Sequence, residues 1–285
     1  MPRLAEIEAH AASMDALLGI VGAMRSLAGI RAQEAQRALP GIRRYAAVVA
    51  EAIGTTLPFI DDGRPPAAST RGRTRALVVL AAEHGFVGGF NERLMNRLES
   101  LRRPSDLLLV MGSRGAAVAV ERGLRPVWTH AMATRSAGAL EAAYLLSAEL
   151  FRRLGPGRLA GVEVLFGRFH RLGLWEVECK SILPLDPAVI PRRSFSQPPL
   201  LNLRPADLLE QLTGEYVFAQ LMETIVESVA SENAARFAAM SAAHDNVGKK
   251  LAKLQEEERL ARQTEITAEL LDLLTGAQGV RDFRA

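Results

Sequence analysis

The sequence is poor in the residues that build metal centres and covalent cross-links. Its 285 residues include one cysteine, Cys179, and five histidines scattered far apart. A single cysteine excludes an internal disulfide or a cysteine-based metal site and fits a reducing compartment. Because no two histidines have the spacing of a helical ligand pair, we expect no metal site. We also find no set of residues that would bind a cofactor or form a catalytic centre.

Concentrated charge and long apolar runs are also lacking. The net charge of +3 is small for this length, so the composition does not indicate nucleic acid as a partner. The first residues, MPRLAEIEAHAAS, carry acidic side chains and no long apolar stretch, so we expect no signal peptide. Because no window approaches the roughly 18 apolar residues of a membrane span, we expect no direct membrane insertion.

Proline is absent after Pro205, and the following residues keep apolar side chains at steps of three and four. We therefore expect one uninterrupted helix over residues 205–285. A helix of that length needs a partner to bury its apolar stripe. The stripe consists of Leu212, Tyr216, Ala219, Met240, His244, Val247, Leu251 and Leu254.

A second helical seam occupies residues 1–60, where a heptad pattern predicts the N-terminal helix of a coiled coil. We expect Leu17, Met24 and Leu27 to widen the apolar stripe. Pro40 and Gly41 are expected to kink or interrupt the helix, because proline removes a helix hydrogen bond. The seam consists of Leu4, Ile7, Ala11, Met14, Leu18, Val21, Arg25, Ala28, Ala32, Ala35 and Leu39.

The pattern changes between these two helices. Residues 61–75 are polar and rich in proline, glycine and arginine, which indicates an exposed linker. Residues 76–198 alternate apolar strand candidates with helical segments, which indicates a small Rossmann-like α/β domain with a mostly parallel sheet. Strands are expected at 76–82, 106–111, 124–128, 162–169 and 175–183, the last two as a hairpin; helices are expected at 91–101, from about 115, and at 138–154.

These segments fit an α/β fold in which the domain is inserted between two long helices that pair as an antiparallel coiled coil. The C-terminal helix is the longer one, so part of it should extend beyond its partner. Its apolar side then needs another protein to cover it. The dense mixed charge of residues 249–263 fits either this partner surface or a solvated helix face.

The segment AAEHGFVGGFNERL, residues 81–94, follows a strand and opens a helix, as phosphate-binding loops do. Its Gly85, Gly88 and Gly89 match neither the dinucleotide fingerprint nor the Walker loop, and the phosphate-binding lysine is absent. Glu83 adds negative charge where a phosphate prefers positive charge. We interpret the glycines as a tight turn that brings a helix close to the sheet.

A second glycine turn, MGSRGAA at residues 111–117, also joins a strand to a helix. It lacks the spacing of a nucleophile elbow, and no acid–histidine pair accompanies it. We therefore interpret it as a helix start with Ser113 near the cap.

The C-terminal helix carries the most specific resemblance to a known family. SENAARFAAMSAAHDNVGKKLAKL, followed by ARQTEITAELLDLLTGAQ, resembles the closing helix of the gamma subunit of F-type ATP synthases. The family signature begins Ile or Val, Thr, any residue, Glu, and ends Gly-Ala. IVGAMRSLAGIRAQEAQ, EHGFVGGFN, VMGSRG and SILPL resemble further family segments, so the likeness covers nearly the whole chain. The signature positions are Ile266, Thr267, Glu269, Asp272, Gly276, Ala277 and Gly279.

Three features depart from the family pattern. ASMDALLGIVGAM stands where the family tends to carry lysines, Pro40-Gly41 is unusual, and the tail GVRDFRA is longer and more charged than expected. They suggest a divergent bacterial branch. The sequence leaves open whether the coupling ion is a proton or sodium, because ion ligands would lie in other subunits.

The resemblance implies a rotor that is not an enzyme by itself. Its coiled coil would turn inside a ring of alpha and beta subunits, whose interfaces bind nucleotide. Its middle domain would rest on the membrane c-ring beside the epsilon subunit, at the cytoplasmic face of the bacterial inner membrane. The orientation of the shaft would couple ion-driven rotation to ATP synthesis or hydrolysis.

The resemblance also implies which residues face the ring, and its arginines would pair with acidic beta-subunit loops. For each of them a solvated or intra-coil position is the alternative. These residues are Met24, Arg25, Arg236, Arg262, Gln263, Thr267 and Glu269. Two other functions stay open on the residues alone: a nucleotide-binding enzyme using the middle α/β domain, and a static coiled-coil scaffold.

Overall fold

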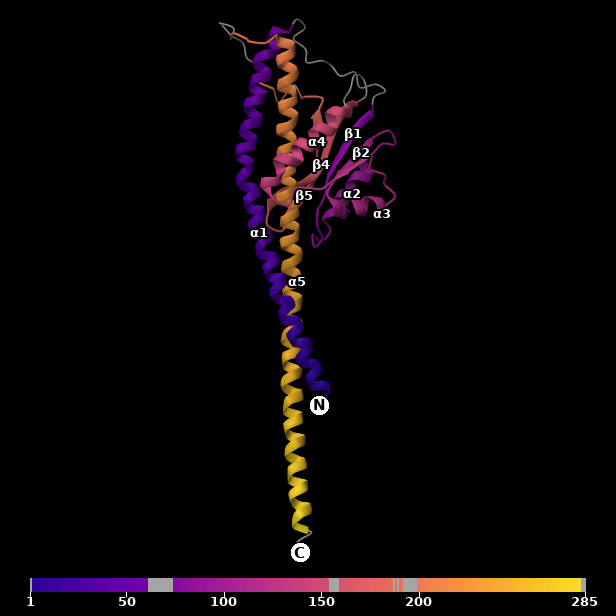
Figure 1. Cartoon of the computed structure of the whole chain (residues 1–285), viewed down its shortest axis with the longest axis vertical. Coiled ribbons are helices and arrows are strands. Elements are labelled where there is room, and N and C mark those ends of the chain that lie inside the picture. Colours follow the sequence, from indigo (N-terminus) through magenta and orange to yellow (C-terminus); the bar gives the residue numbers. More distant parts are fainter. Residues whose placement is uncertain are drawn as a thin grey trace. The chain divides into compact units, whose positions relative to one another are not determined.

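The computed structural model describes residues 2–60, 74–153, 159–186, 188, 190–191 and 199–282 (Figure 1). The chain forms two compact units, one of Leu27–Ala238 and one of Met1–Ser26 with Ala239–Ala285. Helices α1 (Pro2–Thr56) and α5 (Pro205–Asp282) each contribute to both units. The expected linker at 61–75 lies outside the described residues except for Thr74 and Arg75, which begin the first strand.

The larger unit contains a five-stranded sheet in the order β3-β2-β1-β4-β5. Strands β1, β2, β3 and β4 are mutually parallel, whereas β4 and β5 form an antiparallel hairpin. This confirms the predicted parallel sheet with an antiparallel edge. The strands are β1 (Thr74–Leu80), β2 (Leu107–Met111), β3 (Trp128–His130), β4 (Leu159–Arg171) and β5 (Leu174–Leu183).

The prediction for the third strand is wrong in position. We expected it at residues 124–128, but β3 begins at Trp128. Leu124 instead closes the turn after α3 (Ser113–Glu121): its N–H donates to the Ala119 carbonyl oxygen, and its side chain is buried. An apolar residue in a helix-terminating turn produces the same sequence signal as a short strand.

Helices cover both faces of the sheet, which explains why β1 is apolar without alternation. Ala76, Val78 and Leu80 pack toward one core together with α1, α4 (Ala139–Arg153) and α5. Leu77 and Val79 pack toward a second core with α2 (Phe90–Leu101) and α3. Two short 3-10 helices complete the fold, η1 (Leu57–Phe59) and η2 (Ser136–Gly138).

In each unit α1 and α5 run antiparallel: residues later in α1 lie next to residues earlier in α5. Most of the predicted seam on α1 is buried or half-buried, as expected. Leu17 and Leu27 do not widen it and are 38% and 47% exposed, since a pair of helices covers only a narrow stripe. The neighbouring pairs are Gly29 with Phe237 and Arg43 with Glu223 in the larger unit, and Gly22 with His244, Leu18 with Gly248, and Glu8 with Arg262 in the smaller unit; Arg43–Glu223 and Glu8–Arg262 are ion pairs.

We expected Pro40 and Gly41 to kink or interrupt the helix, and the structure shows that they do not interrupt it. The helix is continuous from Pro2 to Thr56, with Pro40 inside it. Both residues of the pair are exposed, whereas Leu39 and Ile42 on either side are buried in the core. Burial of these flanking residues therefore offsets the loss of one helix hydrogen bond.

Helix α1 also contains an 18-residue window, between Leu4 and Phe59, that is apolar enough to cross a membrane, contrary to our expectation. Only 17% of that window is buried. One such helix is weak evidence for a membrane span. The heptad seam pairs one face of α1 with α5, and Ile20, Leu27 and Ile30 on the other side are 58%, 47% and 54% exposed.

Candidate partner-binding surface

The smaller unit is a two-helix pair whose seam becomes polar toward the end of α5. Met240 and Leu251 are buried there. Further along the same register, Glu258, Ala261 and Glu265 are only half-buried. Glu8 of α1 contacts Arg262 at this level, and residues 266–271 of α5 are exposed.

The following turns of α5 expose a series of large apolar side chains. These turns continue the helix without interruption and include the first residues of the signature segment. An apolar helix face of this length is typical of a surface that another chain covers. The exposed fractions are 52% for Ile266, 55% for Leu270 and 70% for Leu273. We refer to these three residues as the apolar end.

Arg262 stands at the border between the seam and the apolar end. Its Nη2 atom lies 2.7 Å from Glu8 Oε1 on α1 and 2.9 Å from Glu258 Oε1 on α5. Its side chain is 56% exposed, so it is also accessible from outside the unit. Any contact of Arg262 with a partner therefore competes with two ion pairs inside the chain.

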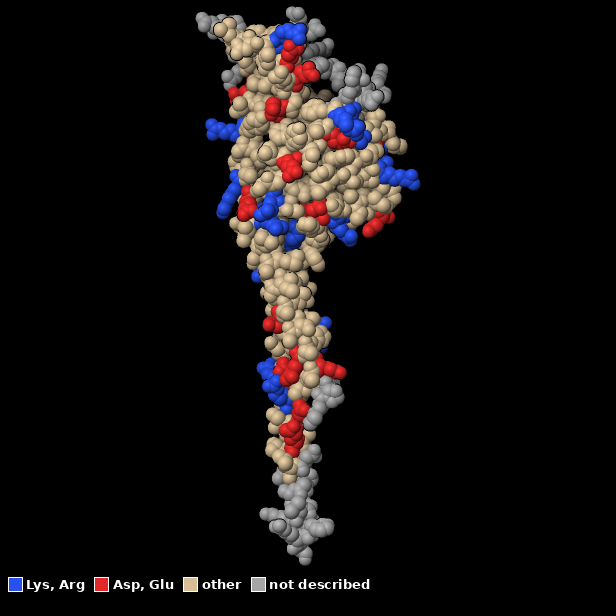
Figure 2. Space-filling view, in the orientation of Figure 1, with Lys and Arg blue, Asp and Glu red and all other residues tan. Residues whose placement is uncertain are grey.

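The other predicted residues of this unit fall into two groups. Gln263, Thr267 and Glu269 are exposed on α5, and the Thr267 hydroxyl donates to the Gln263 carbonyl oxygen at 2.8 Å. Met24 and Arg25 on α1 are half-buried. On the face drawn in Figure 2, acidic and basic side chains lie close to one another along the lower helical part.

Arg236 is placed differently from the other six predicted residues, because it belongs to the larger unit and is buried. Its guanidinium donates to Glu232 Oε1 at 2.5 Å, to Asn233 Oδ1 at 3.1 Å and to the Gly85 carbonyl oxygen at 3.4 Å. Burial raises the pKa of Glu232 despite the charge of Arg236. These contacts favour the intra-chain alternative for Arg236 over a position facing a ring.

The turn between β1 and α2 contains a carboxylate where a phosphate would bind in a nucleotide fold. Glu83 accepts hydrogen bonds from the Ser113 N–H at 3.0 Å, the Ser113 hydroxyl at 2.7 Å and the Met132 N–H at 2.8 Å. Burial acts to raise the pKa of Glu83, but these three donors outweigh it and hold the pKa below its ordinary value. The N-terminus of α3 is thus satisfied by an anion of the chain itself.

The structure corrects part of the interpretation of the glycines in this turn. Gly88 and its neighbour Phe86 have positive φ, as a tight turn requires. A Cβ at Gly85 or Gly89 would meet nothing within 4 Å, so neither glycine is needed for close packing.

The close approach of helix and sheet occurs instead at the second turn. A Cβ on Gly115 would lie 2.0 Å from the Ala81 Cβ, and one on Gly112 would lie 2.4 Å from the Ala81 carbonyl oxygen. The predicted helix start there is confirmed, with α3 beginning at Ser113 and Gly112 at the cap position.

Sequence reasoning missed a row of buried carboxylates on α5. Glu223 is half-buried, and Glu227 and Glu232 are almost fully buried, in a segment whose other residues are mostly apolar or small. Charged residues are rarely buried without partners. The signal in the sequence was the presence of carboxylates within an apolar stretch, although the pattern did not identify their partners.

The remaining reactive groups suggest no chemistry. Burial raises the pKa of the Cys179 thiol to about 11, with Glu163 as a further cause, so the thiol is a poor nucleophile. Among the residues that the structure describes, no group of three or more histidine, cysteine, aspartate or glutamate side chains is placed to hold a metal ion.

Comparison with known proteins gives one family along the whole chain. The family model described as ATP synthase matches residues 3–280. The ATP synthase gamma chain of Geotalea uraniireducens is 26% identical, with 99% of this chain and 100% of the relative covered. The ATP synthase gamma chain of Streptomyces avermitilis is 28% identical, with 96% and 94% covered.

Solved structures give the same fold. A structure of the OSCP, F1 and c-ring of the Euglena gracilis mitochondrial ATP synthase contains a chain that matches with a TM-score of 0.66 at 13% identity. The match covers 100% of this chain and 96% of that one. The central stalk and c-ring of the Tetrahymena thermophila enzyme contain a chain with a TM-score of 0.57 at 17% identity, covering 79% of this chain and 99% of that one.

Proposed function

This chain belongs to the ATP synthase gamma-chain family. We propose that it is the central-stalk rotor of an F-type ATP synthase. It couples ion-driven rotation to ATP synthesis or hydrolysis at catalytic sites that other subunits form. The observation that carries the proposal is the antiparallel pair of α1 and α5, whose longer member exposes the apolar end. Such a pair can transmit torque, and exposed apolar side chains on a helix favour an enclosing partner.

The proposed partners follow from this role. The alpha and beta subunits enclose the helical pair, and the c-ring and epsilon subunit contact the α/β domain. Arg262, Gln263, Thr267 and Glu269, with Met24 and Arg25, face the ring. The subunit is peripheral to the membrane, without inserting into it, and we place it at the cytoplasmic face of a bacterial inner membrane.

The chain performs no bond chemistry in this proposal. Its orientation changes the relative free energies of the conformations of each catalytic site, so that the sites differ in nucleotide affinity at any moment. The position of Glu83 at the N-terminus of α3 speaks against a nucleotide-binding enzyme, because a bound phosphate would meet a carboxylate there.

Reconstitution tests the proposal. Purified alpha and beta subunits are mixed with and without this chain, and assembly, ATP hydrolysis and rotation of a bead on the α/β domain are measured. We expect one chain per ring, a rise in hydrolysis and rotation in one direction. A ring whose stoichiometry and hydrolysis are indifferent to the chain excludes the rotor. A chain that assembles with the ring but never rotates is the static scaffold.

A further inference from the structure

The segment of α5 that crosses the sheet contains two acidic residues one turn apart, Glu223 and Glu227. Their side chains are 15% and 6% exposed. Burying a carboxylate is costly unless its oxygens are paired. The larger unit therefore has to provide partners for four carboxylate oxygens in this part of its core.

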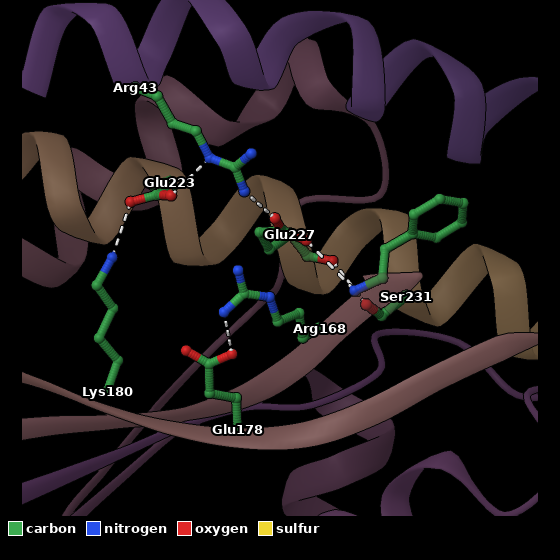
Figure 3. A network of polar contacts seen from close by, with 8 residues as sticks. Arg43, Arg168, Glu178, Lys180, Glu223, Glu227 and Ser231 are labelled. Atoms are coloured by element: carbon green, nitrogen blue, oxygen red, sulfur yellow. Dashed lines mark hydrogen bonds and ion pairs between the residues drawn. The ribbon is translucent and has the colours of Figure 1, made fainter. Parts of the chain in front are cut away.

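One oxygen of each carboxylate faces α1. Arg43 Nε lies 2.9 Å from Glu223 Oε1, and Arg43 Nη2 lies 2.5 Å from Glu227 Oε1 (Figure 3). A single guanidinium on α1 thus spans two successive turns of α5. The planar fork of arginine makes this bridge directional, which a lysine ammonium would not do.

The other oxygen of each carboxylate faces the sheet. Lys180 Nζ on β5 lies 2.8 Å from Glu223 Oε2, and the Phe169 backbone N–H on β4 donates to Glu227 Oε2 at 3.3 Å. The two glutamates therefore connect α1 on one side with the β4–β5 hairpin on the other. Figure 3 shows Arg168 and Glu178 beside them, 2.6 Å apart on β4 and β5.

The two carboxylates differ in their titration. Burial acts to raise the pKa of Glu223, but Lys180 and Arg43 outweigh it and lower the pKa overall. Burial dominates at Glu227 and raises its pKa, although the Phe169 N–H and Arg43 act in the opposite direction. The partners of Glu223 thus outweigh its burial, whereas those of Glu227 do not.

Apolar contacts alone would leave the relative setting of these elements poorly defined. The seam of α1 beside this site consists of Leu39, Ile42 and Ala46, which are all buried. Apolar burial has no direction, and a heptad pattern repeats, so these contacts by themselves favour no single register. Buried polar groups that fix a register are the best-attested use of such pairs.

We propose that Arg43, Glu223, Glu227 and Lys180 form a register lock, a set of positioning residues that hold the helical pair at one angle to the sheet. This inference rests on the proposed rotor function. Torque applied to the α/β domain passes to α1 and α5 through directional hydrogen bonds rather than through apolar contacts that slide. Without the register lock, the angle between the sheet and the two helices fluctuates more, while the helices themselves stay folded.

The test measures the torsional stiffness of the assembled complex. The ring is immobilised, a bead is attached to a cysteine introduced by Glu121→Cys on α3, and its angular fluctuation is recorded between rotation steps. Cys179 competes little for the label, because it is half-buried and its pKa is raised to about 11. The variant is Glu223→Gln/Glu227→Gln. Each carboxylate uses its two oxygens for two different donors. An amide keeps one accepting oxygen and turns an NH2 donor toward the second partner, which is itself a donor, so that contact is lost.

We expect the angular variance of the bead to rise about twofold or more in this variant, because directional ties are lost from the joint. ATP hydrolysis without load stays within about twofold of the wild type, since no catalytic group changes. The matched control is Glu149→Gln, which removes ion pairs to Arg152 and Arg153 that lie within α4 alone. This control leaves the variance at the wild-type value.

Two further measurements separate the possible outcomes. If the double variant does not assemble, the single variants Glu223→Gln and Arg43→Lys replace it, and each should raise the variance by a smaller factor. Wild-type variance in variants that fold and rotate overturns the register lock and leaves the rotor proposal intact. A wild-type complex that hydrolyses ATP without moving the bead overturns the rotor proposal itself.

Discussion

Glu83 accepts two hydrogen bonds from one residue, Ser113, through its backbone N–H at 3.0 Å and its hydroxyl at 2.7 Å. These contacts hold the β1–α2 turn against the first turn of α3. They also place negative charge at the positive end of that helix. The turn thus has the architecture of a phosphate site, with the anion supplied by the chain.

Glu83→Gln should destabilise the protein near neutral pH by about 1 to 2 kcal/mol, since hydrogen bonds to a charged acceptor are lost at a half-exposed site. The pKa of Glu83 is lowered from 4.5 in the folded state. Its stabilisation is therefore present above pH 4.5 and is lost as the pH falls through the folded pKa. Urea unfolding of both proteins at neutral and acid pH measures this difference. A difference that grows toward acid pH contradicts the assignment.

Gly167→Ala should force α5 away from β4. A Cβ at Gly167 would lie 2.7 Å from the Ser231 Cβ and 2.9 Å from Phe90 Cε2. We expect a loss of about 2 to 3 kcal/mol in the free energy of unfolding, as for overpacking in a core. The control is Gly85→Ala, where the new Cβ meets nothing within 4 Å. Chemical denaturation measures the free energy of unfolding of both variants. An equal decrease in the two variants would show that α5 does not pack tightly on Gly167.

Arg262→Glu should reduce coupling between rotation and catalysis while changing the stability of the chain by less than about 1 kcal/mol, because the ion pairs of Arg262 are exposed. Glu8→Gln is the matched variant: it removes the contact of Arg262 with α1 and leaves the arginine in place for a partner. The two variants are compared in membrane vesicles that carry the assembled complex, by the number of ions pumped per ATP hydrolysed. Identical behaviour of both variants would assign Arg262 to the helical pair alone.

Ile266→Ser/Leu270→Ser should weaken assembly with the ring without unfolding the chain. Both side chains are more than half exposed in the described structure, so we expect the stability of the isolated chain to change by less than about 0.5 kcal/mol. Covering each side chain in a partner is worth about 1.5 to 3 kcal/mol, so affinity should fall at least tenfold. Leu140→Ser on α4, 58% exposed, is the control in the same pull-down titration. Equal affinity of the two variants would remove the apolar end from the interface.

Much of the fold follows from local patterns. The alternation of apolar strands with helices predicted the parallel sheet and its antiparallel edge, because both faces of β1 are buried and both demand apolar residues. The heptad seam predicted which residues of α1 would face α5. Several wrong predictions concern single positions. Leu124 closes a turn, Leu17 and Leu27 are exposed beside the seam, and Pro40 is tolerated because Leu39 and Ile42 are buried beside it.

The candidate site was less predictable. The exposed positions of Arg262 and Gln263 agree with a surface role, which stays a prediction until a partner is tested. Arg236 looks equivalent to them in the sequence, but its guanidinium is enclosed by Glu232, Asn233 and Gly85. A charged residue on a helix gives no local sign of whether it faces solvent or a loop from elsewhere in the chain.

The sequence by itself determined the two long helices and the α/β domain between them, because helix and strand periods are properties of neighbouring residues. Only the tertiary structure decided which charges meet. Arg43 and Glu223 are 180 residues apart, and their contact depends on the register of α1 against α5. A heptad pattern repeats at every second turn and so permits several registers. In the register that the structure has, the half-exposed Arg43 pairs with both Glu223 and Glu227.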